Sequence, residues 1–111
     1  MKLESERRGE IMIIRVLVDR IDAAGAIKFK EQMREIVAEP SDRVVLDMSN
    51  VGFLDSSGLG AVVHMMKALG PLRRLELSGL TPVVEKVFRL TRMDSVFIIH
   101  KSLPEGRRNA G

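Results

Sequence analysis

The stretch that decides the fold is Phe53-Leu54-Asp55-Ser56-Ser57-Gly58-Leu59-Gly60. An apolar run, Val44 to Met48, precedes it, and a helix-like run, Ala61 to Leu69, follows it and is closed by Gly70-Pro71. This order reads as strand, loop, acidic and hydroxyl cluster, then helix. Free backbone N–H groups at the start of a helix attract anions. Two serines beside a carboxylate therefore predict a phosphorylation switch at the N-terminus of this helix.

Two strands and one helix are predicted before this stretch. Residues 2–8 alternate weakly, and residues 11–18 are rich in β-branched side chains, so both are expected to form a hairpin that turns at Gly9-Glu10. Asp22 is placed to cap the following helix, which Pro40 ends. The buried stripe expected on this helix recurs at spacings of three and four and consists of Ala26, Phe29, Met33, Ile36 and Val37.

The second helix, from about Ser57 to Leu69, is apolar around almost its whole circumference. Such a helix is buried on more than one side, and either neighbouring elements or a partner protein could cover it. Residues 73–77 are predicted to form a strand, and Thr81-Pro82 matches an N-cap followed by proline at the first helical position. A turn at 93–95 and a last strand at 96–99 complete the chain.

The predicted order of elements is β-β-α-β-α-β-α-β. Strand–helix–strand units imply right-handed parallel crossovers. We therefore predict an α/β fold with a mostly parallel sheet of four or five strands, an N-terminal hairpin and three or four helices. The 111 residues suffice for one domain, which we place at 1–103, followed by a polar tail at 104–111.

Composition narrows the function. Hydrophobic residues make up 45% of the chain and charged residues 30%, as in a globular protein. The absence of cysteine excludes disulfides and thiolate metal sites, and with only two histidines we expect no metal or cofactor. Dispersed basic residues and the lack of Trp and Tyr argue against direct binding of nucleic acid. The first eight residues have no signal-peptide core, and no apolar run reaches the length of a membrane span, so we expect a cytoplasmic protein without membrane contact.

A serine hydrolase built from Ser57, His64 and Asp55 is not expected. His64 lies seven residues after Ser57, which is about 10 Å along a helix. A nucleophile and its base must lie about 3 Å apart. We therefore predict that the chain is not an enzyme and that it has no catalytic residues.

Two other kinds of site are compatible with parts of the sequence. Gly58-Leu59-Gly60 resembles part of a dinucleotide-binding loop, but Val63 stands where a third glycine is required. A receiver-like phosphoacceptor domain would use Asp47 and Lys101, but such domains alternate strand and helix from the start, whereas this chain opens with a predicted hairpin. Both remain as alternatives to the serine switch.

Four stretches of the chain resemble the STAS domain, and more narrowly the stand-alone bacterial anti-sigma-factor antagonists. They are residues 18–24 (VDRIDAA), 44–49 (VVLDMS), 51–60 (VGFLDSSGLG) and 77–84 (LSGLTPVV). The resemblance extends from about residue 3 to residue 103, and the Asp-Ser-Ser-Gly-Leu-Gly block is its most specific part.

The resemblance implies a partner-switching role. The unmodified antagonist would bind an anti-sigma factor, often a serine kinase of the histidine-kinase ATPase fold, and so free a sigma factor. The kinase would phosphorylate Ser57 and release the antagonist, and a serine phosphatase would restore it. Asp55 would be the acidic neighbour, and the partner-binding surface would consist of Asp22, Asp55, Ser56, Gly58, Leu59 and Gly60. The sequence also leaves open whether the apolar second helix forms a weak homodimer.

The chain departs from the family pattern in two places. Asp19 stands where a glycine is often found before the loop that contains Asp22. A C-terminal helix is not visible in residues 102–111, which Pro104 and Gly106 interrupt, so we expect a shortened or disordered end. The main alternative within the family is a STAS subunit of another complex, such as a lipid-transport ATPase or a stress-signalling assembly.

Overall fold

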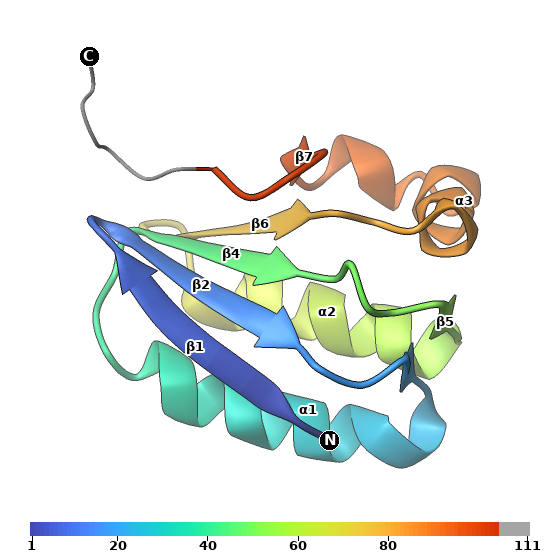
Figure 1. The fold of residues 1–111 in the computed structure, drawn as a ribbon, viewed down its shortest axis with the longest axis horizontal. Coiled ribbons are helices and arrows are strands. Elements are labelled where there is room, and N and C mark those ends of the chain that lie inside the picture. Colours follow the sequence, from blue (N-terminus) through green and yellow to red (C-terminus); the bar gives the residue numbers. More distant parts are fainter. Residues whose placement is uncertain (105–111) are drawn as a thin grey trace.

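The computed structural model describes residues 1–104 and shows a five-stranded sheet (Figure 1). The strands are β1 (Leu3–Arg8), β2 (Ile11–Val16), β4 (Arg43–Asp47), β6 (Arg74–Ser78) and β7 (Ile99–His100), in the order β1-β2-β4-β6-β7. β1 pairs with β2 antiparallel, and every other neighbouring pair of this sheet is parallel. The predicted α/β class, N-terminal hairpin and mostly parallel sheet are confirmed, and this opening hairpin separates the fold from a receiver domain.

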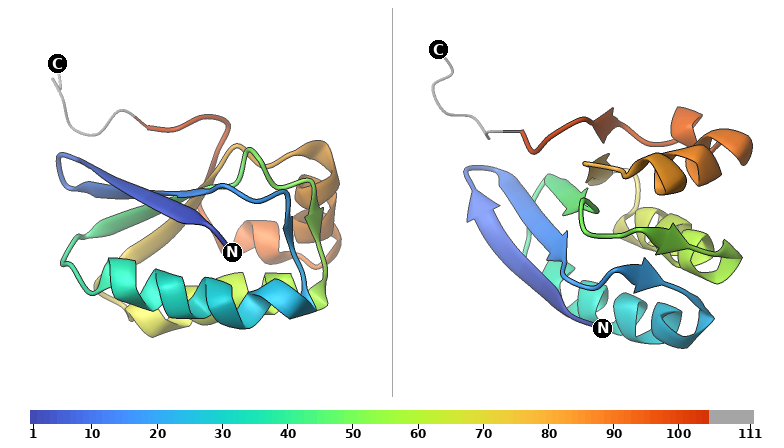
Figure 2. Two further views of the ribbon diagram at one scale, coloured as in Figure 1. Left: turned by 60° about the horizontal axis from the view of Figure 1, so that its bottom comes forward. Right: turned by 45° about the vertical axis from the view of Figure 1, so that its right-hand side comes forward.

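Three α-helices accompany the sheet. α1 (Ala23–Val37) and α2 (Ser56–Leu69) lie side by side against one face of the sheet, as both views in Figure 2 show. α3 (Pro82–Leu90) and the short 3₁₀ helix η1 (Met93–Ser95) follow β6 and lead into β7. Within residues 1–104, no helix has both the length and the apolar character needed to cross a bilayer.

The main core lies between the sheet and the helices. Alternate residues of β2, β4 and β6 point toward α1 and α2, and they meet Phe29 and Met33 of α1 and Met65 of α2. The opposite face of the sheet has a much smaller apolar cluster, made of Ile11, Ile13 and Val45, with Leu103 packed against it. The helix pair therefore closes one face of the sheet, and the other face is shared between this cluster and charged side chains.

A second sheet was not predicted from the sequence. β3 (Arg20–Ile21) and β5 (Phe53–Leu54) pair in parallel just before the starts of α1 and α2. The Gly52 amide also donates to the Asp19 carbonyl at 2.8 Å, and the Asp55 amide to the Ile21 carbonyl at 3.4 Å. This small sheet fixes the two loops to each other and places both helix N-termini at one end of the molecule.

The structure corrects several predicted boundaries. The last strand is Ile99–His100 rather than 96–99, and Val96 and Ile98 are exposed large hydrophobic residues. The strand predicted at 11–18 ends at Val16. Thr81 occupies the N-cap position of α3 but makes no capping hydrogen bond, because its hydroxyl donates to the Val51 carbonyl at 2.8 Å. The expectation of a shortened or disordered end falls mainly on residues 105–111, outside the described residues.

Candidate functional site

Asp55 links the starts of the two helices that cover the sheet. Its Oδ1 accepts a hydrogen bond from the Gly58 amide at 2.9 Å, which caps α2, and its Oδ2 accepts one from the Ala23 amide at 3.1 Å, at the start of α1. Both carboxylate oxygens therefore bind backbone N–H groups that a helix start otherwise leaves without partners. Asp55 thus holds the start of α2, which contains the serine block, against the start of α1.

Asp22 caps α1 in the same manner. Its Oδ1 accepts from the Gly25 amide at 3.1 Å, and its Oδ2 pairs with Arg20 Nε at 3.0 Å. The Gly25 hydrogen bond, followed by the Arg20 contact, lowers the pKa of Asp22 below its ordinary value. The Arg20 guanidinium also lies 4.8 Å from the ring centroid of Phe53, within cation–π range. Asp22 is therefore an anchored carboxylate beside a fixed loop.

Ser56 and Ser57 occupy the first two positions of α2, and both are exposed. Within residues 1–104, neither hydroxyl makes a hydrogen bond. The side chain of Ser57 therefore lies where a modifying enzyme can reach it, at the positive end of a helix dipole. A buried Ser57 would have removed the basis for the predicted switch.

The two glycines of the block have different roles. Gly58 is buried, and a Cβ added there would lie 2.0 Å from the Ile21 carbonyl oxygen and 2.9 Å from Leu54 Cδ1. The missing side chain of Gly58 permits the close packing of α2 on β3, and its expected part in the docking surface stays a prediction. Gly60 is exposed, and a Cβ there would meet nothing within 4 Å.

One flank of α2 is open. Gly58, Ala61, Val62, Met65 and Leu69 are buried against the rest of the fold. The other flank borders a groove of about 380 Å³ between α2 and η1, lined by Ser56, Leu59, Gly60, Val63, His64, Lys67, Thr91 and Met93. Neighbouring elements therefore cover α2 only in part, and the uncovered part begins at the serine block.

His64 does not form a catalytic group with Ser57. It is exposed, and its Nε2 lies 3.3 Å from Arg34 Nη2 on α1. The carboxylate of Asp55 is bound to two backbone amides. Two of the three residues that a hydrolase would need, His64 and Asp55, are therefore held in other contacts.

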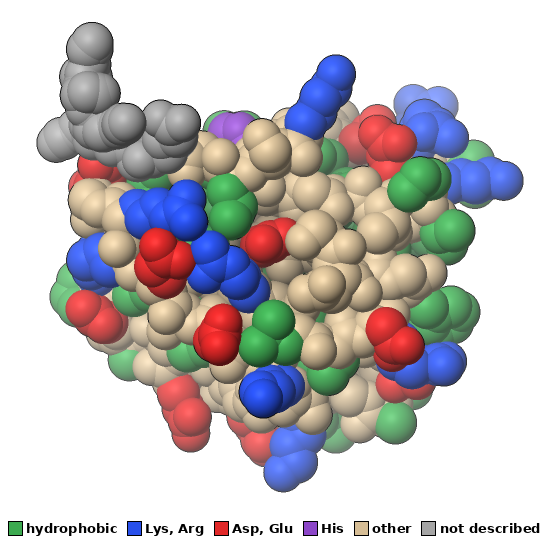
Figure 3. Space-filling view, viewed as in Figure 1, with side chains coloured by type: hydrophobic (Ala, Val, Ile, Leu, Met, Phe, Trp, Pro, Cys, Tyr) green, Lys and Arg blue, Asp and Glu red, His purple; other side chains and the backbone are tan. Residues whose placement is uncertain are grey.

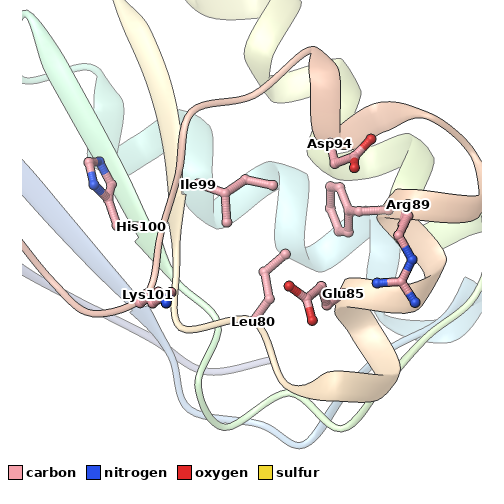
Figure 4. A pocket seen from close by; sticks show the side chains of 8 residues that line it. Leu80, Glu85, Arg89, Asp94, Ile99, His100 and Lys101 are labelled. Atoms are coloured by element: carbon pink, nitrogen blue, oxygen red, sulfur yellow. The ribbon is translucent and has the colours of Figure 1, made fainter.

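A larger hollow, of about 440 Å³, lies elsewhere. Figure 4 shows Leu80, Glu85, Arg89, Asp94, Ile99, His100 and Lys101 around it, between α3 and β7. None of the residues that the sequence singled out for the serine switch lines this hollow. Its wall mixes charges of both signs, so size alone does not make it the functional site.

A buried carboxylate on the sheet was missed by the sequence analysis. Glu76 of β6 is 1% exposed; it accepts hydrogen bonds from Arg43 Nε and Nη2 at 2.9 and 2.8 Å, and its Oε1 lies 2.7 Å from His100 Nε2. Burial raises the pKa of Glu76, but the contacts with Arg43 and His100 outweigh it and lower the pKa overall. Figure 3 shows acidic and basic side chains interspersed over the molecular face seen in Figure 1. The Glu76 cluster joins β4, β6 and β7 and has a structural role.

Comparisons with known proteins place this arrangement in a family. The family model for the STAS domain matches residues 2–106. A Bordetella bronchiseptica protein named "Putative anti-sigma factor antagonist BtrV" is 29% identical over 92 residues, which cover 82% of this chain and 79% of that protein.

Solved structures show the same fold. An anti-sigma factor antagonist from Mycobacterium paratuberculosis has a TM-score of 0.83 at 24% identity and covers 92% of this chain and 86% of its own. The Bacillus cell fate determinant SpoIIAA, solved in its phosphorylated form, has a TM-score of 0.60 at 22% identity, with 88% of each chain covered. Because the family model matches residues 2–106, which is nearly the whole chain, this chain belongs to the STAS domain family.

Proposed function

We propose that this protein is an anti-sigma factor antagonist whose docking is switched off by phosphorylation of Ser57. The observation that carries the proposal is the exposed Ser57 hydroxyl in the first turn of α2, next to the uncovered flank of that helix. In the unmodified state this end of the molecule binds an anti-sigma factor and so releases a sigma factor. The names of BtrV and of the Mycobacterium paratuberculosis protein support this role.

The physical basis of the switch is the charge of a phosphate. A phosphoserine carries roughly −1.5 to −2 charges at neutral pH. In the first turn of α2 the helix dipole tolerates this charge, so the fold survives the modification. At a protein interface, burying an unpaired charge costs several kcal/mol, and each ~1.4 kcal/mol changes affinity tenfold. One phosphate is therefore sufficient to release the partner.

The proposed partners are an anti-sigma factor that is itself a serine kinase of the histidine-kinase ATPase fold, and a serine phosphatase that reverses the modification. The docking surface consists of Ser56, Ser57, Leu59 and Gly60 on α2, with Asp22 on the neighbouring loop. Asp55 and Gly58 support this surface from beneath through the contacts described above. The proposed compartment is the cytoplasm, where sigma factors act.

The test begins with a pull-down from the source cell, using the wild-type protein and Ser57→Asp as bait. The kinase recovered by the wild type is then incubated with MgATP and the wild type, Ser57→Ala or Ser56→Ala, and the products are mapped by mass spectrometry. We expect one phosphate on Ser57 in the wild type and in Ser56→Ala, and none in Ser57→Ala. Phosphate on Ser56 or on Asp47 would contradict the proposal.

A calorimetric titration then measures docking of the purified kinase. We expect Ser57→Asp to weaken binding at least about tenfold, while Glu31→Gln, at an exposed position on α1 outside the docking surface, stays within about threefold of the wild type. Circular dichroism of Ser57→Asp should match that of the wild type, because the fold is retained. Equal affinity of Ser57→Asp and the wild type would rule out a mechanism based on charge.

A further inference from the structure

We infer that the groove between α2 and η1 receives an acidic, apolar segment of the partner protein, and that a phosphate on Ser57 repels this segment. The inference rests on the docking role proposed above and adds the chemistry of the bound segment. It starts from the composition of the groove walls rather than from the serine alone.

The floor of the groove is apolar. Leu59 and Val63 on α2 and Met93 on η1 line it, and all three are only partly buried. The part of α2 that borders it, from Ser56 to Lys67, spans 12 positions, or roughly 17 Å at 1.5 Å per residue. This length accommodates about three helical turns of a partner segment with apolar side chains on one face.

The cationic side chains at the groove are Lys67, which lines it, and Arg34, whose Nη2 lies 3.3 Å from Nε2 of the lining residue His64. Among the described residues that line the groove, none is a carboxylate. Asp94, which neighbours Met93 in sequence, lines the separate hollow between α3 and β7. Charge complementarity therefore favours an acidic segment over a basic one.

The positive charge of Lys67 and the site of the proposed phosphate lie at opposite ends of the groove. Lys67 lies at one end of the groove, and Ser56, which directly precedes Ser57 in sequence, lies at the other. These two ends are roughly 17 Å apart along the helix. An acidic segment is attracted to the Lys67 end, and phosphate at Ser57 adds negative charge at the serine end. The expected repulsion acts over the Debye length, about 10 Å at 0.1 M salt.

The test uses two synthetic helical peptides of about 15 residues, one made of Leu, Ala and Glu and its twin with Lys in place of every Glu. Each is titrated into the isotope-labelled full chain and followed by nuclear magnetic resonance. The acidic peptide should shift the amide resonances of Leu59, Val63 and Met93, and the basic twin should not. Equal binding of both peptides, no binding of the acidic one, or shifts confined to the α3–β7 hollow would overturn the inference.

Charge-reversed variants sharpen the test. Lys67→Glu should weaken the acidic peptide about threefold or more. The matched control is Lys28→Glu on α1. Lys28 is exposed and does not line the groove, so this variant should bind like the wild type. An equal effect of both variants would show only a dependence on net charge.

The role of Ser57 is tested with the same peptide. Ser57→Asp should weaken the acidic peptide at low salt, and this effect should shrink at about 0.5 M salt. If the cognate kinase loses affinity for Ser57→Asp while the acidic peptide is indifferent to Lys67→Glu, the serine switch stands and the acidic segment is excluded. If the acidic peptide binds as expected but no phosphate appears on Ser57, the groove stands and the proposed switch fails.

Discussion

The serine block shows how one residue type has two physical roles a few positions apart. Gly58 permits the N-terminal turn of α2 to contact the backbone of β3, because any side chain would overlap the Ile21 carbonyl. Gly60 is exposed, and a Cβ added there would meet nothing within 4 Å. A glycine in a helix costs about 1 kcal/mol relative to alanine. At Gly58 that cost accompanies a packing requirement, whereas at Gly60 no contact within the fold requires it.

This contrast gives a matched prediction. Gly58→Ala should lower the free energy of unfolding by about 2 kcal/mol or more, because the obstructing atom belongs to backbone that must move. Gly60→Ala should raise it by up to about 1 kcal/mol through helix propensity alone. Urea unfolding followed by circular dichroism measures both. Changes of the same sign would refute the assignment of Gly58 to packing.

At the scale of elements, the starts of α1 and α2 behave as one unit because Asp55 accepts hydrogen bonds from both. The β3–β5 pair holds the preceding loops in register. The exposed Ser57 therefore projects from a corner of the fold that the β3–β5 pair and the two Asp55 hydrogen bonds hold together.

Replacing each capping aspartate with asparagine tests this coupling. Asp55→Asn keeps an oxygen for the Gly58 amide, but its NH₂ group then faces the Ala23 amide, so two donors oppose each other. We expect a loss of about 1–2 kcal/mol of unfolding free energy. Asp22→Asn keeps its cap on Gly25 and loses only the exposed pair with Arg20, so it should cost less than about 0.5 kcal/mol. Urea titrations at neutral pH compare them, and equal losses would argue against the bridge through Asp55.

The elements that the sequence predicted correctly are those with a clear period or cap. The stripe of α1, the hairpin at Gly9-Glu10 and the cap at Asp22 are local patterns, and each is present in the structure. β3 and β5 are too short to show a period, and their pairing depends on residues more than thirty positions apart. The last strand was predicted too early in the sequence, because Val96 and Ile98 are residue types typical of a strand yet lie exposed on the surface.

The features of the candidate site also fall into two groups, those that local sequence predicts and those that depend on distant contacts. Ser57 and its carboxylate neighbour follow from local sequence. The bridge from Asp55 to Ala23, the burial of Gly58 and the groove against η1 arise only when distant segments meet. The Glu76 cluster could not be predicted for the same reason. The alternation in residues 73–77 indicates a strand, but it does not indicate which face of the sheet a charged side chain occupies or which residues it contacts.

At the scale of the whole molecule, the Glu76 cluster and the proposed docking surface lie on opposite faces of the sheet. By strand register, Glu76 lies opposite Val45 and Ile13, which belong to the small cluster on the face away from α1 and α2. Its contacts with Arg43 and His100 join three neighbouring strands. The serine block lies on the helix side. A change in the Glu76 cluster should therefore weaken the fold without altering the docking surface.

Glu76→Gln tests this separation. Removing one partner of a buried ion pair leaves Arg43 without its counter-charge, so we expect a loss of about 3 kcal/mol of unfolding free energy at pH 7. Because Arg43 and His100 lower the pKa of Glu76 in the folded state, its ionised form contributes stability above the unfolded value of about 4.3, and this contribution is lost as the pH falls through the lowered folded pKa. The stability of Glu76→Gln should therefore depend less on pH between about 5 and 3 than that of the wild type.

The control for this prediction is Glu31→Gln, an exposed position on α1, which should stay within about 0.5 kcal/mol of the wild type. Urea unfolding at a series of pH values supplies the stabilities, and calorimetry with the recovered kinase, at a temperature where every variant is folded, supplies the affinities. Because the cluster and the serine block lie on opposite sides of the sheet, Glu76→Gln should bind the kinase like the wild type despite its lower stability. A loss of affinity in the folded variant would show that the two faces are coupled and that the sheet takes part in partner recognition.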